Sequence, residues 1–176
     1  MSFHSGAFAQ PDEHYPPEPT AYRFENYRAP TPQTLQGARV VTTREAEAIW
    51  KKANAIFVDV LPQSPKPQNL PPGTIWHDKP RLDIPGSIWL PDTGYGALAR
   101  AMNEYFRAGL LKASGGNRNK ALVIYCLRDC WMSWNAAKRA MALGYTRVIW
   151  YPEGTDGWSE AGLPLTGATP RPRPRQ

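Results

Sequence analysis

The chain has 176 residues, enough for one domain with a full hydrophobic core, and 41% of them are hydrophobic. Its net charge is +6 at pH 7, but arginines in the last six residues supply three of these charges, so the remainder is only mildly basic. No apolar stretch reaches the ~18 residues that a membrane span needs. No cluster of basic and aromatic side chains outside the tail indicates a nucleic-acid interface. We therefore expect neither a membrane span nor a nucleic-acid partner.

The 19 prolines divide the chain into parts. Six of them lie within residues 1–38, which show no sustained apolar periodicity and are predicted to form an extended N-terminal arm. Residues 167–176 contain a Pro/Arg repeat and are predicted to be a basic tail. A further group of prolines predicts a long loop over residues 62–85. Residues 39–166 remain as the folded domain.

Within that domain, short apolar runs alternate with amphipathic stretches. The predicted strands are residues 39–42, 55–60, 87–91, 121–125 and 147–151. One predicted helix begins at a capping box of Thr42 and Glu45, and two further helices are predicted over residues 93–113 and 134–143. This order is typical of an α/β fold with a mostly parallel sheet and helices on both faces. Ligands of such sheets bind at the carboxyl ends of the strands.

The chain has only two cysteines, Cys126 and Cys130, and both lie on the segment between the strand 121–125 and the next helix. Backbone N–H groups and the positive end of a helix dipole stabilise a thiolate at such a position. A curled loop of N–H donors is also an anion-binding nest. The alternative is a buried cysteine that packs as a small hydrophobe.

Several landmarks resemble the rhodanese family. In chain order they are Asp59-Val60, residues 84–88, Tyr125-Cys126 with its loop, residues 143–145, and Gly157-Trp158 before residues 161–164. More narrowly, residues 126–137 are similar to a group of rhodanese-like bacterial proteins named for a CxxCW motif and associated with catabolism dependent on pyrroloquinoline quinone (PQQ). The similarity to this group extends to residues 22–38, 94–98 and 150–158. The resemblance implies a rhodanese-like domain, export to the periplasm and a place in PQQ-linked alcohol oxidation, with no settled reaction.

In rhodaneses, the cysteine at the strand end carries a transferred sulfur as a persulfide, and N–H groups of the following loop hold the anion. The resemblance therefore implies that Cys126 is the nucleophile. It assigns the anion cradle to the loop residues Leu127, Arg128, Asp129, Trp131, Met132 and Ser133.

This loop departs from ordinary rhodanese loops because it lacks glycine and has Asp129 in the region where glycine is usual. Aspartate tolerates a left-handed backbone. Its carboxylate, however, would raise the thiol pKa unless Arg128 compensates. In phosphatase-type members, an anion-binding arginine ends the loop. Met132 or Ser133 has that position here, which disfavours phosphatase activity.

Cys130 is the second departure. Two cysteines four positions apart on a curled loop can approach within disulfide distance. In an oxidising compartment, Cys130 would then be the redox partner of Cys126 or form a structural bridge with it. The remaining alternative is that Cys130 packs beside Trp131. The spacing of His and Cys residues indicates no metal site, and we expect no cofactor.

Supporting residues are expected at the same sheet edge. Asp59 either orients the cysteine loop or caps a neighbouring turn. The long loop that follows carries Trp76, His77, Lys79 and Arg81 and is interpreted as a wall or lid of the site, with a solvated linker as the alternative. Residues 153–157 are predicted to be a turn that could contribute there. Of Trp131 and Trp134, one is expected to pack against the loop and the other to face a partner.

Two functions remain open. The first is an enzyme, a periplasmic sulfurtransferase that performs persulfide or thiol–disulfide transfer with a sulfur donor or a small thiol. The second is a non-catalytic accessory module with a structural Cys126–Cys130 disulfide that assists a PQQ-dependent dehydrogenase or its electron-transfer partner. The first ten residues lack the apolar region of a signal peptide, yet Ala7-Phe8-Ala9 has the form of an export cleavage site. The tripeptide is either a coincidence or the remnant of an exported precursor.

Overall fold

The structure is a computed structural model that describes residues 14–174, so Ala7-Phe8-Ala9 and Arg175 lie outside the described residues. Five parallel strands form its central sheet in the order β1-β6-β5-β2-β4. They are β1 (Arg39–Val40), β2 (Ala55–Asp59), β4 (Ile88–Trp89), β5 (Ala121–Tyr125) and β6 (Val148–Tyr151). All residues of β5 are buried because it is the central strand and both of its faces are covered. A separate antiparallel pair joins β3 (Leu82–Asp83) to β7 (Thr166–Gly167).

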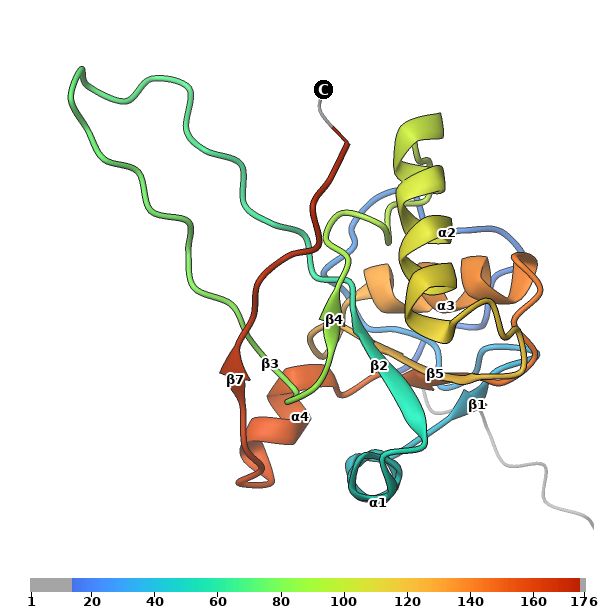
Figure 1. The fold of residues 1–176 in the computed structure, drawn as a ribbon. Coiled ribbons are helices and arrows are strands. Elements are labelled where there is room, and N and C mark those ends of the chain that lie inside the picture. The colour runs from blue at the N-terminus through green and yellow to red at the C-terminus, as the bar shows by residue number, and fades with distance from the viewer. Residues whose placement is uncertain (1–13, 175–176) are drawn as a thin grey trace, which may run out of the picture.

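Helices cover both faces of the sheet (Figure 1). On one face lie α2 (Arg100–Ser114) and α3 (Trp131–Ala142), and on the other lie α1 (Thr43–Lys52) and α4 (Gly154–Glu160). Alternate strand residues enter the two cores: Leu122 and Ile124 pack toward α2 and α3, whereas Val123 and Tyr125 pack toward α1 and α4. The predicted α/β class, with a mostly parallel sheet and helices on both faces, is confirmed.

Some element boundaries differ from the predictions. The helix α2 begins at Arg100 instead of near residue 93, because the preceding segment packs closely on α3. A Cβ atom at Gly94 would lie 2.4 Å from the Met132 carbonyl oxygen. The helix α3 begins at Trp131, three residues before the predicted start, and Cys130 is its N-cap residue. Residues 153–157 do not form a simple turn but open the helix α4.

The N-terminal arm is extended and is fastened to α3 by one buried amide. The Asn135 Oδ1 atom accepts a hydrogen bond from the Arg23 backbone N–H at 2.9 Å. The Asn135 Nδ2 atom donates to the carbonyl oxygens of Arg23 and Gly94, both at 2.8 Å. This side chain therefore joins the arm, α3 and the segment before α2.

Two indole groups continue this attachment. Trp131 donates its indole N–H to the Pro30 carbonyl at 3.1 Å, and Trp134 donates its indole N–H to the Thr34 carbonyl at 3.2 Å. The backbone N–H of Trp131 also donates to the Tyr27 carbonyl at 2.9 Å. Both tryptophans are buried. The expectation that one of them faces a partner is therefore wrong, because the arm covers both rings.

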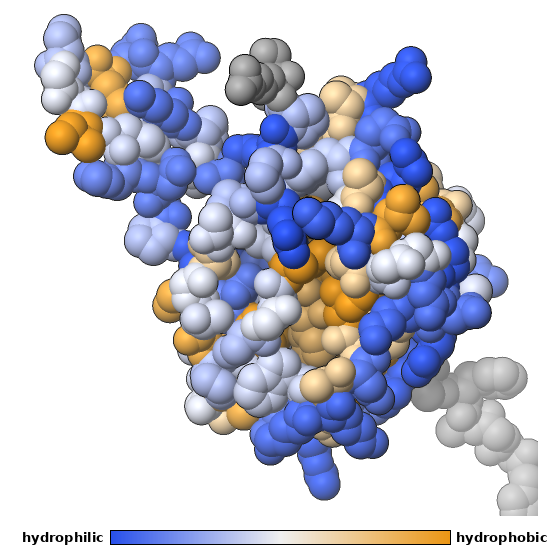
Figure 2. Space-filling view, in the orientation of Figure 1, coloured by the Kyte–Doolittle hydropathy of each residue, from blue (hydrophilic) through white to orange (hydrophobic). Residues whose placement is uncertain are grey.

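The C-terminal tail packs against the domain, whereas the proline-rich loop extends away from it (Figure 1). The tail runs beside β4, where the Arg171 N–H donates to the Trp89 carbonyl at 2.9 Å and Arg173 pairs with Asp92. The loop between β2 and β3 projects away from the body (Figure 1). Its surface is mostly hydrophilic, with hydrophobic spots toward its far end (Figure 2).

Within residues 14–174, no helix has both the length and the apolar character required to cross a membrane.

The Asn135→Ala substitution is expected to lower the free energy of unfolding by about 1–3 kcal/mol, because it leaves buried backbone groups without partners. Denaturant unfolding of both proteins measures the difference. The matched control is Asn69→Ala in the projecting loop, where the side chain is exposed and a change of less than ~0.5 kcal/mol is expected. Equal stabilities of the two variants would show that the arm is not fastened in this way.

Candidate active site

The cysteine loop joins the end of β5 to the start of α3 and is tightly curled. Cys126 follows β5, and its carbonyl oxygen accepts a hydrogen bond from the Thr155 N–H at 3.1 Å. Asp129 has a φ angle of +51°, the left-handed conformation expected of an aspartate at this position. The curl returns the chain so that Cys130 lies beside Cys126, and the two thiols shift each other's pKa in opposite directions.

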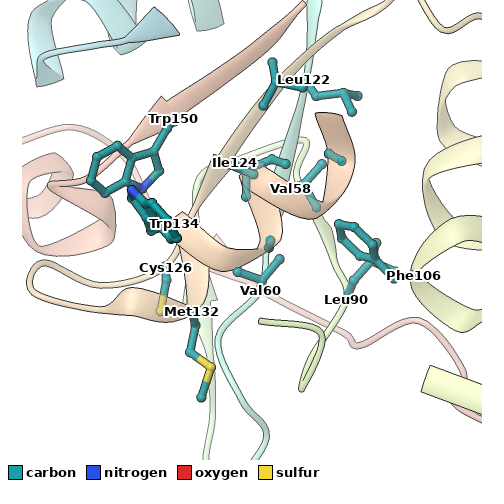
Figure 3. Close-up of a cluster of buried hydrophobic side chains, with 14 of the residues drawn as sticks. Val58, Val60, Leu90, Phe106, Leu122, Ile124, Cys126, Met132, Trp134 and Trp150 are labelled. Atoms are coloured by element: carbon teal, nitrogen blue, oxygen red, sulfur yellow. The ribbon is translucent and has the colours of Figure 1, made fainter. Parts of the chain in front are cut away.

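Cys126 is the inner member of this pair. Its side chain is 0% exposed and lies in the apolar cluster between the sheet and α3, beside Met132 and Trp134 (Figure 3). Burial raises the pKa of the Cys126 thiol well above its ordinary value. The hydrogen bond to Cys130 and the negative charge of Asp59 shift the pKa in the same direction. The surroundings of Cys126 therefore oppose its ionisation.

Cys130 is the outer member and has the opposite electrostatic environment. Hydrogen bonds from the Cys126 thiol and from the backbone N–H groups of Met132 and Leu127 lower the pKa of Cys130 to about 6, although burial opposes the shift. The positive charge of Arg28 also lowers this pKa. In addition, an N-cap residue lies at the positive end of the helix dipole. The surroundings of Cys130 thus favour ionisation more than those of Cys126 do, and the assignment of Cys126 as the nucleophile stays a prediction.

Cys130 also faces the cavity of the site. This cavity has a volume of about 630 Å³ and lies between the cysteine loop, the N-terminal arm, the base of the projecting loop and the start of α4. Cys130 is among the residues that line it, although only 2% of its surface is exposed. The charged lining residues are Arg28, Lys79, Arg81 and Asp156. Because Arg81 is paired with the buried Asp59, Arg28 and Lys79 exceed the single remaining carboxylate, Asp156, by one charge, which favours an anionic ligand.

Only part of the expected anion cradle is free to act on the sulfur. The Arg128 backbone N–H donates to the Asp156 Oδ2 atom at 3.0 Å. The Arg128 guanidinium pairs with Glu153 and Glu160, each at 2.5 Å. Arg128 therefore cannot supply the charge compensation that we expected of it. Asp129 is exposed and lines a different cavity.

Of the remaining cradle residues, two act on the Cys130 sulfur and two are hydrogen-bonded elsewhere. The backbone N–H groups of Leu127 and Met132 interact with the Cys130 sulfur. The backbone N–H of Trp131 is occupied by the arm. The Ser133 hydroxyl donates to the Cys130 carbonyl at 3.1 Å and accepts from the Trp150 indole at 3.0 Å, so Ser133 shapes the start of α3.

The structure does not bring Trp76 and His77 to the site. Both lie on the projecting loop, where the Trp76 indole donates to Asp78 at 3.1 Å, and neither lines the cavity of Cys130. Lys79 and Arg81, at the base of the same loop, do line it. Only the base of the loop therefore forms a wall, and the interpretation of Trp76 and His77 as lid residues is wrong.

Asp59 anchors this wall. Its Oδ1 atom accepts from the Leu61 N–H at 2.9 Å, which caps the turn after β2, and its Oδ2 atom accepts from the Arg81 Nε at 2.7 Å. Arg81 Nη1 donates in turn to the Thr155 Oγ1 atom at 3.2 Å. Asp59 thus caps a turn and orients Arg81, and the hydrogen bonds described for it do not reach the cysteine loop.

Burial raises the pKa values of two carboxyl groups near the cavity, those of Asp59 and Asp83. Burial raises the pKa of Asp59, and the Arg81 guanidinium opposes this shift. Burial acts to lower the pKa of Arg81, but Asp59 more than reverses it, so Arg81 stays charged. Burial and the charge of Asp59 together raise the pKa of Asp83 to about 7. Asp59 and Arg81 consequently act as one ion pair.

The sequence predicted the N-terminal arm but not that it lines the site, and it predicted a turn where α4 begins. Tyr27 and Arg28 line the cavity, and the backbone of Arg28 bridges to that of Cys130. The available signal was the motif resemblance of residues 22–38. Gly154 has a φ angle of +52°, and a Cβ atom there would lie 2.3 Å from the Cys126 carbonyl oxygen. A glycine three positions after the last residue of the strand was the sign of this close approach.

The described residues contain no group of three His, Cys, Asp or Glu side chains that could hold a metal ion.

The family model for the rhodanese-like domain matches residues 42–161. This chain belongs to the rhodanese-like domain family. No curated protein sequence matches it.

Solved structures show the same fold. Thiosulfate sulfurtransferase from Pseudomonas aeruginosa is 16% identical with a TM-score of 0.50, and the match covers 79% of this chain and 22% of that one. An EanB variant in complex with ergothioneine is 20% identical with a TM-score of 0.50, covering 75% and 32% of the two chains. An EanB variant with a cysteine persulfide is 19% identical with a TM-score of 0.50, covering 74% and 32%. This rhodanese-like chain thus spans between a fifth and a third of these proteins.

The pKa of Cys130 can be tested by titrating the ultraviolet absorbance of the thiolate in two variants of Cys126. In Cys126→Ser, a hydroxyl still donates to Cys130, so the thiolate should form as the pH rises through about 6. In Cys126→Ala the donor is lost, and the midpoint should move toward the ordinary value of about 8.5. Because the folded pKa is depressed, the ionised thiol stabilises the fold above its unfolded pKa, and this contribution is lost as the pH falls through about 6. Equal midpoints near 8.5 in both variants would contradict the assignment.

Proposed function

We propose that this rhodanese-like protein transfers sulfur or disulfide equivalents through its cysteine pair. Cys130 is the thiolate that meets the substrate, and Cys126 is the buried thiol that resolves the product. The observation that supports this most strongly is geometric: Cys130 lines the cavity, whereas Cys126 is fully buried beside it. The directions of the pKa shifts, lowered for Cys130 and raised for Cys126, agree with these roles.

The chemistry starts with a persulfide donor of the form R–S–SH. The Cys130 thiolate attacks the outer sulfur, the S–S bond breaks, and the donor leaves as the thiol R–SH while Cys130 becomes a persulfide. The N–H groups of Leu127 and Met132 stabilise the anion. An acceptor nucleophile that reaches this persulfide receives the outer sulfur, and Cys130 returns to the thiolate. This sequence is sulfur transfer without net oxidation.

Cys126 offers a second outcome. Its sulfur attacks the inner sulfur of the persulfide, a Cys126–Cys130 disulfide forms, and HS⁻ leaves with the proton that Cys126 gives up. A disulfide R–S–S–R reacts by the same two steps and yields two R–SH. The substrate gains two electrons and the protein loses two, so a dithiol or another thiol reductant must restore the pair. The contact between the two sulfurs favours this outcome over a long-lived persulfide.

The setting that we propose is the bacterial periplasm, beside PQQ-dependent alcohol oxidation, with a quinoprotein dehydrogenase or its electron-transfer partner as a candidate partner. The support is the similarity of residues 126–137 and 22–38 to the CxxCW group. These two stretches contact each other in the fold, through Tyr27 and Trp131 and through Arg23 and Asn135. In an oxidising compartment the pair would rest as a disulfide.

A purely structural disulfide is the alternative. Such a bridge would close a loop of only a few residues and would therefore give stabilisation at the lower end of the usual ~2–4 kcal/mol. The shifted pKa of Cys130 and its place in a cavity wall are not needed for a structural bridge. The burial of Trp131 and Trp134 also removes the aromatic surface that an accessory module was expected to present.

Trapping the first covalent intermediate tests the roles of the two cysteines. In Cys126→Ser, a neutral substrate such as 2-hydroxyethyl disulfide should leave one substrate thiol attached to Cys130, because the resolving sulfur is absent. In Cys130→Ser, the buried and protonated Cys126 should react slower by about 100-fold or more. The wild-type protein should end with two hydrogens fewer than its reduced mass.

Intact-protein mass spectrometry over time measures all three reactions, and circular dichroism confirms that both variants are folded. Rapid adduct formation in Cys130→Ser but not in Cys126→Ser would reverse the roles. Absence of any adduct in the folded wild-type protein would contradict the proposed function.

A further inference from the structure

The C-terminal tail follows the edge of the central sheet, which is the strand β4. Pro170 lies beside Trp89 as the next strand of a parallel sheet would. The Arg171 N–H donates to the Trp89 carbonyl at 2.9 Å, and the Arg171 carbonyl accepts from the Tyr105 hydroxyl of α2 at 2.8 Å. The tail therefore covers an edge of the sheet and is held there by its backbone.

Arg173 joins the end of the tail to the projecting loop. Its Nη1 atom forms an ion pair with Asp92, which lies in the segment before α2. Its Nη2 atom donates to the Gln63 Oε1 atom at 2.6 Å. Gln63 belongs to the first leg of the loop, four residues after the end of β2. Asp92, Arg173 and Gln63 thus form a latch between the body of the domain and the loop.

Gln63 also connects the two legs of the loop. Its Nε2 atom donates to the Asp78 Oδ2 atom on the second leg at 3.3 Å. The Asp78 Oδ1 atom accepts in turn from the Trp76 indole at 3.1 Å. Six prolines within residues 62–80 restrict the backbone of both legs. The loop is therefore a stiff unit, and the latch holds this unit at Gln63.

Gln63 lies between two cavities. One is the cavity of Cys130, which Gln63 lines together with Ser64. The other has a volume of about 710 Å³, and its lining includes Asp92, Tyr95, Met102 and Arg173. Among residues 14–174, Gln63 is the only one that lines both. A movement of Gln63 away from Arg173 would therefore join the two cavities and widen the entrance to the buried Cys130.

The latch is weaker than the contacts around it. The base of the loop is fixed by Arg81, which pairs with the buried Asp59, and by a hydrogen bond of 2.7 Å from the Trp89 indole to the Leu61 carbonyl. The side chains of Arg173 and Asp92, by contrast, are 37% and 20% exposed. Water and salt screen the attraction of such a pair. The latch can therefore open while the base of the loop and the tail stay attached.

We propose that the C-terminal tail is a strap whose latch controls the entrance to the cavity of Cys130. With the latch closed, Gln63 separates the two cavities and narrows the way to the sulfur. With the latch open, the loop pivots about its base, the cavities join and larger molecules reach the sulfur. This inference goes beyond the proposed function, because it concerns access to Cys130 and does not depend on which cysteine is the nucleophile.

The test measures how fast Cys130 reacts with two neutral maleimides of different size, N-ethylmaleimide and N-(1-pyrenyl)maleimide. The background is Cys126→Ser, which leaves Cys130 as the single cysteine of the chain. Mass spectrometry over time gives a second-order rate constant for each reagent. The ratio of the large reagent to the small one cancels changes in the reactivity of the thiol itself. In Arg173→Gln this ratio should rise about twofold to fivefold, as expected for the loss of one partly exposed ion pair.

Matched variants assign the effect to the latch. Asp92→Asn removes the other charge and should raise the ratio to a similar extent, and the double variant should not exceed the two single ones. Arg173→Lys keeps the charge and should restore most of the original ratio. Arg171→Gln is the control, because Arg171 is exposed and holds the tail through its backbone, and it should leave the ratio unchanged.

Salt provides a second readout that a general loss of stability would not reproduce. Raising the NaCl concentration from about 0.05 M to about 0.5 M screens the ion pair and should increase the ratio by about twofold in the background variant. The same change should have no effect on the ratio in Arg173→Gln, where the pair is already absent.

A ratio that neither Arg173→Gln nor Asp92→Asn raises, in variants that circular dichroism shows to be folded, would overturn the strap. An equal rise in Arg171→Gln would also overturn it, because the effect would then come from general loosening of the tail. These results are independent of the proposed function, which depends on adduct formation with 2-hydroxyethyl disulfide. Maleimides react with any accessible thiol, so the ratio can be measured whether or not that adduct forms.

Discussion

The close approach of Cys126 and Cys130 is the constraint around which the site is arranged. The two buried sulfurs have different surroundings, because Cys126 lies in an apolar cluster near Asp59 and Cys130 receives backbone N–H groups at the start of α3. A single cysteine in such a loop would have to be both reactive and protected from solvent. With two, the inner sulfur is protected and the outer one is ionised beside the cavity.

Contacts from distant parts of the chain keep this pair in place. The arm holds the start of α3 through Tyr27 and Trp131, and α4 holds the end of β5 through Thr155 and Cys126. Thr155 also receives Arg81, so one residue connects the cysteine loop to the cationic wall of the cavity. The site therefore depends on the arm and on α4 as much as on the loop that carries the cysteines.

The parts that could be predicted from the sequence are those with local causes. The apolar runs of β2 and β5 indicated buried parallel strands, and Thr42 with Glu45 indicated the start of α1. The curl at Asp129 followed from the tolerance of aspartate for a left-handed backbone. The role of Cys130 could not be predicted in this way, because its pKa depends on N–H groups, on Arg28 and on Cys126 brought together by folding. The positions of Trp76 and His77 likewise depend on where the loop points, which no local pattern encodes.

The most direct test of the account is to equilibrate the purified wild-type protein in glutathione redox buffers, block free thiols and count the labels by intact mass. The account predicts two labels under reducing conditions and none under oxidising conditions, in a single two-electron transition with the fold retained. An oxidised end state that keeps one free thiol and one bound glutathione would show that Cys126 does not resolve Cys130, and would contradict the central claim.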